Sequence, residues 1–230
     1  MAKVEPRYRP GIQTRGEDTR RRILDSAIEL FASEGYEGAS TRLLAERAGV
    51  NLPAIQYYFG SKEGLYRAAV ARISDEIEAQ MGPTRERAMA ALEHPALGRR
   101  ELCALLCDML EAFVAMVLSG AEAGSARKLF IARAEIEGQA ALDLLHDNMV
   151  RQVLRPCSAV LARLIRRPAE DEETVLRTIA LLGQVTIFCN KPTRRALGWS
   201  EFNPARVAQI RAVVRRHTEA LFGADGIAGS

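Results

Sequence analysis

The sequence predicts an all-α protein, because apolar residues recur at helical spacing along nearly all of its 230 residues. No stretch alternates apolar and polar residues as the strands of a sheet do, and no strand-helix-strand unit can be recognised. The hydrophobic content of 48% is ordinary for a globular protein with a buried core. Gly and Pro residues divide the chain into what we expect to be about nine or ten helices.

The first helix is expected over about residues 18–34, and Gly35 follows at a position that favours a left-handed cap. Ser40 is a good N-cap for a short second helix that ends at Ala48. The face that the first helix would bury is an apolar stripe at helical spacing, formed by Ile23, Leu24, Ala27, Ile28 and Phe31.

Two more helices follow closely in the sequence. Asn51 is a good N-cap for the third helix, and Pro53 is tolerated in its first turn. Ser61 caps a fourth helix, which we expect to end near Met81 because Gly82-Pro83 breaks the chain there.

Beyond this break the periodicity predicts six further helical segments, and Pro156 is expected to kink one of them. The last two carry apolar stripes suited to packing against other helices. These six segments cover about residues 84–93, 99–118, 126–136, 139–165, 171–190 and 204–222.

The chain therefore divides into four regions. Residues 1–16 are expected to form a flexible basic arm, 17–65 a three-helix domain, 66–223 a larger helical domain, and 224–230 a tail. Residues 1–22 hold seven Lys and Arg against three Asp and Glu. This excess suits the phosphate backbone of a nucleic acid, although a solubilising disordered tail would have the same composition.

Several kinds of protein are disfavoured by the sequence. No apolar run is long enough to span a bilayer, and the N-terminus lacks the apolar region of a secretory signal, so we expect a cytoplasmic protein without membrane contact. The four cysteines lie at 103, 107, 157 and 189 without further Cys or His at ligand spacing, which predicts no metal site and no cofactor. We expect them to act as small buried hydrophobic residues.

Residues 40–65 have the pattern of a helix-turn-helix. Ala48-Gly49-Val50 supplies a small residue, backbone freedom and an apolar plug, which together hold two short helices at a steep angle. On the second of these helices Ile55 is expected to face the core and Gln56 the solvent. Gln and Asn side chains can pair bidentately with adenine, whereas Tyr hydroxyls and Lys62 would hold phosphates.

Residues 18–67 resemble the DNA-binding domain of the TetR/AcrR transcriptional regulators. The family typically consists of homodimeric, all-helical repressors that small ligands release from DNA. The residues that carry the resemblance are Ile23-Leu24, Ala27, Leu30-Phe31, Gly35-Tyr36, Ser40, Leu44-Ala45, Ala48-Gly49-Val50, Tyr57, Phe59 and Ser61-Lys62-Glu63-Gly64-Leu65.

This resemblance implies DNA contacts at the start of the second and third helices and at the start of the fourth. Gln56 departs from the family, which often has Tyr there, so a phosphate contact would be exchanged for a base contact. Tyr57 and Tyr58 have an alternative role in packing the junction between the third and fourth helices. The expected DNA-binding set is Thr41, Arg42, Asn51, Leu52, Pro53, Gln56, Tyr57, Tyr58 and Lys62.

The remainder more loosely resembles the C-terminal domain of the CecR type of these regulators, whose members are linked to responses to drugs or toxic compounds. One departure is Glu137-Gly138, where the family usually has a proline. The matching residues are Lys128-Leu129-Phe130-Ile131 through Glu135, Leu182-Gly183-Gln184, Phe188, Arg194-Arg195 and Leu197-Gly198-Trp199.

The larger domain is expected to provide both a dimer interface and a ligand cavity. The last two helices would form a four-helix bundle with a second copy, unless their stripes serve the core of a single chain. The dimer candidates are Val175, Ile179, Leu182, Val207, Ile210 and Val214. The candidates for lining a cavity, for which an ordinary core or surface role is the alternative, are Met109, Phe113, Met116, Phe130, Arg133, Met149, Gln184 and Phe188.

These features predict a sequence-specific DNA-binding regulator, in the form of a homodimeric repressor that a small hydrophobic or amphipathic effector releases from a palindromic operator on double-stranded DNA. A regulator that responds to no small ligand, such as an activator or one controlled by a protein partner, is the alternative. A helical enzyme is a remote third interpretation, because the sequence has no phosphate-binding loop, catalytic triad or metal spacing. The helix over 61–81 would link the two halves, and its tilt would carry the signal.

Overall fold

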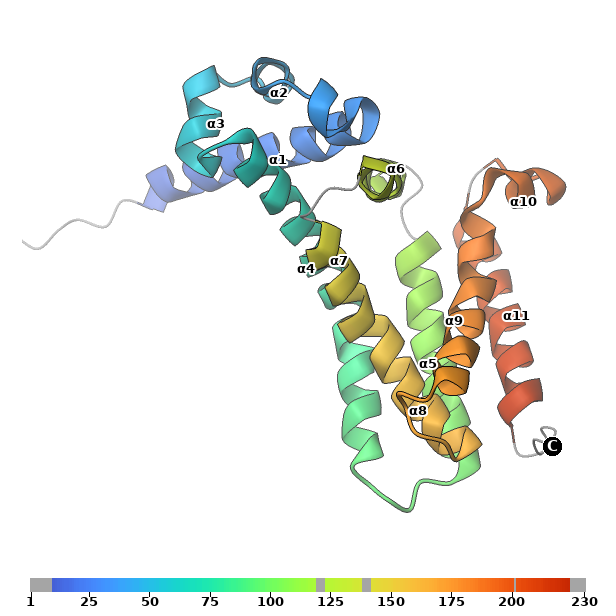
Figure 1. The fold of residues 1–230 in the computed structure, drawn as a ribbon. Coiled ribbons are helices and arrows are strands. Elements are labelled where there is room, and N and C mark those ends of the chain that lie inside the picture. The colour runs from blue at the N-terminus through green and yellow to red at the C-terminus, as the bar shows by residue number, and fades with distance from the viewer. Residues whose placement is uncertain (1–9, 119–122, 138–141, 201, 224–230) are drawn as a thin grey trace, which may run out of the picture. The chain divides into compact units, whose positions relative to one another are not determined.

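The computed structural model describes residues 10–118, 123–137, 142–200 and 202–223, and every regular element within these segments is a helix (Figure 1). The chain forms two compact units. The first contains residues 1–72 together with 126–142, and the second contains residues 73–125 together with 143–230. The all-α prediction is confirmed.

The first unit contains α1 (Pro10–Gly38), α2 (Thr41–Ala48), α3 (Leu52–Phe59), the start of α4 (Lys62–Leu92) and most of α6 (Ala123–Glu137). Helix α1 starts at Pro10, so residues 10–16 of the expected flexible arm are helical; residues 1–9 and the tail at 224–230 lie outside the described residues. The expected domain boundary at 65–66 falls inside α4, whereas the compact units divide after Arg72.

An aromatic cluster forms part of the core of the first unit. The Phe31 ring of α1 meets the Tyr66 ring of α4 edge to face at 5.0 Å, and Tyr66 stacks on Phe130 of α6 at the same centroid distance. All three side chains are buried. Such pairs add about 0.5–1.5 kcal/mol beyond the burial of their apolar area. Helix α6 is therefore part of the core of the first unit, although it lies more than 50 residues further along the chain than Tyr66.

Helix α4 continues through Gly82-Pro83 to Leu92, so the predicted break at this point is wrong. The Arg85 guanidinium donates to both carboxylate oxygens of Glu78, at 3.0 and 3.1 Å, and this ion pair spans the proline turn. Met81 and Ala88, on either side of the turn, are buried. The ion pair and the buried contacts offset the hydrogen bond that Pro83 cannot make.

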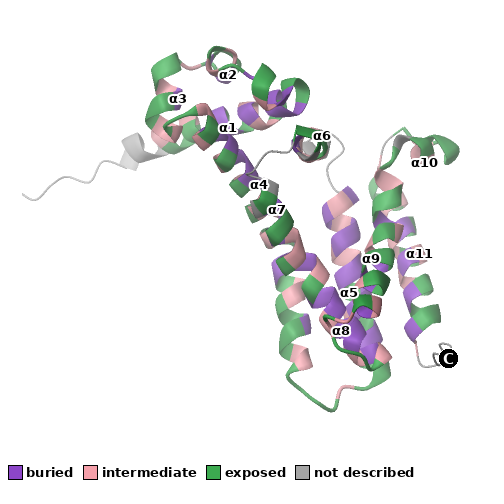
Figure 2. Ribbon diagram, viewed as in Figure 1, coloured by how far each residue is buried: buried purple, intermediate pink, exposed green. Residues whose placement is uncertain are grey.

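The second unit is built around α5 (Arg99–Leu118), which packs against α8, α9 and α11. Figure 2 shows the buried residues of this unit concentrated along α5 and α8. Its further elements are α7 (Leu142–Met149), a π-helical turn (Val150–Leu154), α8 (Arg155–Ile165), α9 (Glu172–Thr186), a 3-10 turn (Ile187–Cys189), α10 (Lys191–Ala196) and α11 (Pro204–Phe222).

The single helix predicted over 139–165 is thus three elements in the described residues, with a π-helical turn before Pro156. The Arg155 N–H donates to the carbonyl of Val150, and Pro156 then occupies the first turn of α8, where its missing N–H costs nothing. Helix α10 lies in a segment for which the sequence predicts a loop.

No described helix is long and apolar enough to cross a membrane. Within the same residues, no group of three or more acidic, His or Cys side chains is placed to hold a metal ion. Cys103, Cys107 and Cys157 are buried and Cys189 is partly exposed. Burial raises the pKa of the Cys157 thiol to about 12.

Candidate nucleic-acid interface

The turn between α2 and α3 is fixed by backbone geometry. The Ser40 hydroxyl caps α2 by accepting from the Leu43 N–H at 3.2 Å. Gly49 ends the helix in the left-handed region, with φ 62° and ψ 41°. The N–H groups of Gly49 and Val50 then donate back to the carbonyls of α2, at 3.1 and 3.0 Å. The chain can therefore turn sharply and direct α3 away from α2.

Asn51 begins α3 as its N-cap. Its side-chain Oδ1 accepts from the Ala54 N–H at 3.1 Å. Because the amide oxygen is used in this way, the donors on Nδ2 are left for DNA, and bidentate pairing with adenine would require the cap to open.

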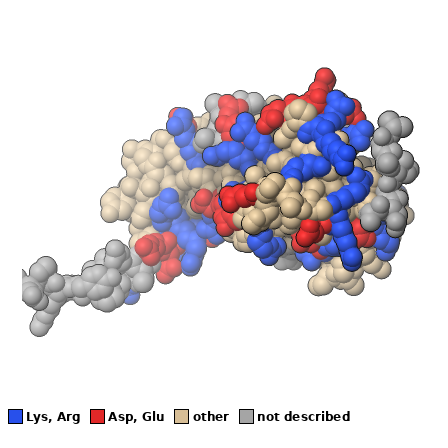
Figure 3. Space-filling view, turned by 90° about the horizontal axis from the view of Figure 1, so that it is seen from below, with Lys and Arg blue, Asp and Glu red and all other residues tan. Residues whose placement is uncertain are grey.

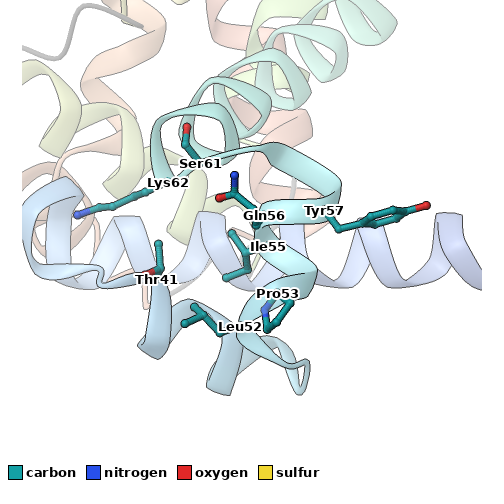
Figure 4. A pocket seen from close by; sticks show the side chains of 8 residues that line it. All are labelled: Thr41, Leu52, Pro53, Ile55, Gln56, Tyr57, Ser61 and Lys62. Atoms are coloured by element: carbon teal, nitrogen blue, oxygen red, sulfur yellow. The ribbon is translucent and has the colours of Figure 1, made fainter.

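The side chains of α2, α3 and the start of α4 surround an open hollow of about 730 Å³ (Figure 4). It contains six of the nine predicted DNA-binding residues, and Arg42, Asn51 and Tyr58 are outside its lining. In Figure 4 Gln56 lies between Thr41 and Tyr57, and the Tyr57 ring extends away from the other side chains. The lining residues are Thr41, Leu52, Pro53, Ile55, Gln56, Tyr57, Ser61 and Lys62.

The two adjacent tyrosines have different surroundings. Tyr57 is 83% exposed, so its ring is not packed in the helix junction. Tyr58 is partly buried, and its hydroxyl lies 3.8 Å from the position that a Cβ on Gly16 would occupy. Tyr57 is therefore largely open to the solvent and touches only the neighbouring Tyr58 ring, edge to face at 5.0 Å between centroids, among the ring contacts of the described residues, whereas Tyr58 also lies against α1.

Lys62 interacts with the end of α1 in this structure. Its Nζ lies 4.5 Å from the centroid of the Tyr36 ring and donates to the carbonyl of Glu37 at 3.4 Å. A cation over an exposed aromatic ring gains about 0.5–1 kcal/mol. The sequence alone did not connect Tyr36 with Lys62, because the two residues are 26 positions apart and only the fold brings them together.

Helix α6 holds the end of α1 that carries Tyr36. The Glu137 carboxylate accepts from the Tyr36 N–H at 2.9 Å, and the Arg133 guanidinium donates to the carbonyl of Ser33. Gly35 lies between these contacts with φ 76° and ψ 177°, a conformation open to Gly almost alone. Phe130 and Arg133, two of the predicted ligand-lining residues, are thus placed in the first unit.

The other predicted ligand-lining residues lie in the second unit. Met109, Phe113 and Met116 are buried in α5, and Met149, Gln184 and Phe188 are partly buried. The Gln184 Nε2 is buried without a hydrogen-bond partner among the described residues. The cavity formed by these residues stays a prediction.

The predicted dimer residues differ in exposure. Ile210 and Val214 are buried by α5 of their own chain, in agreement with the alternative of an intramolecular core. Ile179 is 51% exposed, and Val175, Leu182 and Val207 are partly buried. Three further apolar residues with large exposed fractions lie on the same two helices or just beyond, namely Leu176, Ile187 and Leu221.

Charge is mixed on the surface, in keeping with the formal net charge of only +3. On the face shown in Figure 3, Lys and Arg side chains are interspersed with Asp and Glu. The hollow lined by α2, α3 and the start of α4 contains one charged group, Lys62. Base contacts from polar side chains would therefore matter there beside the electrostatic attraction to phosphates.

The helix-turn-helix and the second unit each match a known family. Residues 23–69 match the model of the bacterial regulatory proteins of the tetR family, and residues 103–225 match that of the C-terminal domain of the HTH-type transcriptional dual regulator CecR. CecR of Shigella flexneri is 30% identical over 218 residues, which are 92% of this chain and 95% of CecR. The chain belongs to the TetR family. It is a DNA-binding transcriptional regulator with a CecR-type C-terminal domain.

The chain is also similar to a further regulator in sequence and to solved structures in fold. The repressor AcnR of Corynebacterium glutamicum is 45% identical over 51 residues, which are 22% of this chain and 27% of AcnR. The crystal structure of the TetR-family regulator PfmR from Thermus thermophilus aligns with a TM-score of 0.58 at 20% identity, covering 92% of this chain and 98% of PfmR. AibR, solved with isovaleryl coenzyme A and operator DNA, aligns with a TM-score of 0.57 at 16% identity, covering 89% and 98%.

Proposed function

We propose that this TetR-family regulator is a homodimeric repressor that binds a palindromic operator and leaves it when a small amphipathic effector binds. The observation that carries the DNA-binding part is the hollow on α2 and α3. Gln56 and Tyr57 are exposed on its rim beside Lys62, so that a base reader and a phosphate-binding cation share one surface. The expected readers are Thr41 and Gln56, and the expected phosphate contacts are Tyr57 and Lys62.

Dimerisation is supported by the apolar residues that α9 and α11 leave exposed. Leu176, Ile179 and Leu221 are each more than half exposed, at 55%, 51% and 51%. Together with the partly buried Leu182 and Val207 they would pack against the same helices of a second copy. Two reading helices about 34–36 Å apart would then meet successive major grooves.

Control of DNA binding would pass through two elements. Helix α4 runs from the first unit into the second. Most of α6 belongs to the first unit, whereas the segments of the chain before and after it belong to the second. Moving the ratio of DNA-competent to incompetent forms from 99:1 to 1:99 requires an effector preference of about 10⁴-fold, near 5.5 kcal/mol. If operator-bound and effector-bound crystals had the same Lys62 to Lys62 separation across the dimer, a change in α4 tilt would be ruled out.

Binding of a small molecule has support from a protein of similar fold. AibR was solved with both a coenzyme A thioester and operator DNA, so this fold accommodates a ligand and DNA in one protein. The relative CecR is named a dual regulator, which favours a second proposal in which this chain also activates transcription. Transcription assays in both orientations of an operator and promoter would distinguish repression from activation.

The DNA-binding proposal is tested by selection from a random duplex library, followed by affinity measurements on the selected operator. Gln56→Ala is expected to reduce the preference for operator over random duplex by about 5- to 150-fold, corresponding to the 1–3 kcal/mol of a good base contact. Arg100→Gln, an exposed change at the start of α5, is the matched control and should leave this preference unchanged. Unchanged selectivity in the Gln56 variant would exclude Gln56 as a base reader, and a selection that enriches no sequence would refute the proposed function.

A further inference from the structure

A groove of about 840 Å³ lies within the second unit, between the second half of α4, the π-helical turn with α8, and the start of α9. Its size is within the range of about 300–1,000 Å³ that is usual for small-molecule sites. Most of its lining is apolar, and its charged residues are three arginines and one glutamate. The lining residues are Arg85, Met89, Val150, Arg151, Leu154, Arg155, Pro156, Ser158, Ala159, Ala169, Glu170 and Val175.

The π-helical turn forms one wall of this groove. Val150, Arg151 and Leu154 belong to the turn, and Arg155 follows it. Turns of this kind interrupt α-helices mostly as single insertions and occur frequently at functional sites. Here the turn and the next residue together bring two arginines to the same opening.

Two of the three arginines have unused hydrogen-bonding capacity. The Arg155 guanidinium has no hydrogen-bond or ionic partner in the described part of the chain. Arg151 donates through Nε to the backbone carbonyl of Asp147 at 3.3 Å, which leaves the Nη groups to a ligand. Arg85, by contrast, is neutralised by Glu78 and Glu86 and also donates to Gln152.

The floor of the groove favours an apolar ligand body rather than a second anionic group. Ser158 is 4% exposed, and its hydroxyl donates to the Thr178 hydroxyl at 3.1 Å. The hydroxyl proton of Ser158 is used in this hydrogen bond, so the Ser158 oxygen can only accept a hydrogen bond from a ligand in the groove. An anionic group has no proton to donate and would avoid this oxygen. Apart from Arg85, which is already paired, and the Glu170 carboxylate, which an anion would also avoid, the remaining lining is hydrocarbon, so the negative end of a ligand is directed to Arg151 and Arg155.

We propose that this groove binds a small amphipathic anion, with its carboxylate, sulfonate or phosphate at Arg151 and Arg155 and its apolar body along Met89, Leu154 and Ala159. The inference deepens the proposed effector control and rests on it for its biological meaning. It also assigns Val175 to the groove, although the sequence placed this residue at a dimer interface.

The test compares two fluorescent probes that share an aromatic body and differ in charge. 8-Anilino-1-naphthalenesulfonate carries a sulfonate, and N-phenyl-1-naphthylamine is its neutral counterpart. We expect the folded wild-type protein to bind the sulfonate more tightly. Arg155→Gln and Arg151→Gln should each weaken sulfonate binding about tenfold, the loss of one charge-assisted contact of about 1.4 kcal/mol, and change binding of the neutral probe by less than about twofold.

Two variants test the location of the apolar body. Ala159→Trp should fill the groove and weaken both probes, with its folded state checked by circular dichroism. Met89→Glu adds a negative charge at a side chain that is 41% exposed, so the fold is retained, and binding of the sulfonate should fall more than binding of the neutral probe. Arg100→Gln, which lies outside the groove, is the matched control and should leave both probes unchanged.

Equal sulfonate affinity in wild type, the two arginine variants and Met89→Glu would overturn the proposal. It would also be overturned if Met89→Glu changed the sedimentation mass, because the groove would then be a contact between copies. Since these measurements contain no DNA, their failure leaves the DNA-binding function standing, and a failed operator selection leaves the groove standing.

Discussion

Gly35→Ala should lower the unfolding free energy of the first unit, because it strains the backbone and displaces a carboxylate. Gly35 has φ 76° and ψ 177°, and holding a residue with a Cβ there costs on the order of 1–3 kcal/mol. The added Cβ would meet the Glu137 carboxylate and lie 3.3 Å from Arg133 Cδ. Glu137 can move aside, but the Tyr36 N–H then loses its acceptor, at a further cost of about 0.5–1.5 kcal/mol. The expected loss of unfolding free energy is about 1.5–4.5 kcal/mol.

Urea unfolding followed by circular dichroism measures this loss, and hydrogen exchange locates it in α1. Gly183→Ala is the matched control, because a Cβ there meets nothing within 4 Å and should stabilise α9 by about 0.4–1 kcal/mol. Combining Gly35→Ala with Glu137→Ala should cost less than the sum of the two, because the steric conflict disappears. A Gly35→Ala protein within about 0.5 kcal/mol of wild type, or strictly additive effects, would refute the reasoning.

Three more predictions follow from single side chains. Lys62→Gln should reduce the slope of log affinity against log salt by about 0.9 for each DNA-bound copy, and an unchanged slope would mean that Lys62 meets no phosphate. Burial, with a smaller effect of Glu137, raises the pKa of Tyr66 to about 12, so the folded state keeps a proton that the unfolded state loses. Stability is therefore present below pH 10.0 and falls as the pH rises toward 12, and Tyr66→Phe should flatten this fall in alkaline unfolding curves. A short iodoacetamide pulse at neutral pH should label the partly exposed Cys189 before Cys157, whose pKa is raised to about 12 by burial, as peptide mass spectrometry would show.

Local signals predicted most of the elements. The caps at Ser40 and Asn51 act as expected, and the helices over 99–118 and 204–222 have the predicted bounds. These features depend on hydrogen bonds between residues a few positions apart, so the sequence contains the whole interaction. The same holds for the hollow that α2, α3 and the start of α4 form within 22 residues, from Thr41 to Lys62.

Local sequence signals did not predict the features that depend on contacts between side chains further apart in the chain. Gly82-Pro83 usually ends a helix, but the Glu78–Arg85 ion pair and the buried Met81 keep α4 continuous. Phe130 and Arg133 were expected to line a ligand cavity. In the structure α6 packs Phe130 against α1 and α4, and Arg133 bonds to α1. Periodicity gives the apolar face of a helix and leaves open which neighbour covers it.

The sequence by itself determined the all-helical architecture and the helix-turn-helix, because short-range caps, turns and spacing encode them. Only the tertiary structure decided that α6 joins the first unit, that Tyr36 lies beneath Lys62, and that two arginines flank an apolar groove. Each of these depends on contacts between segments distant in the chain. Such contacts form through the burial of apolar surface, which is non-directional and so leaves the choice of partner to the packing of the whole unit.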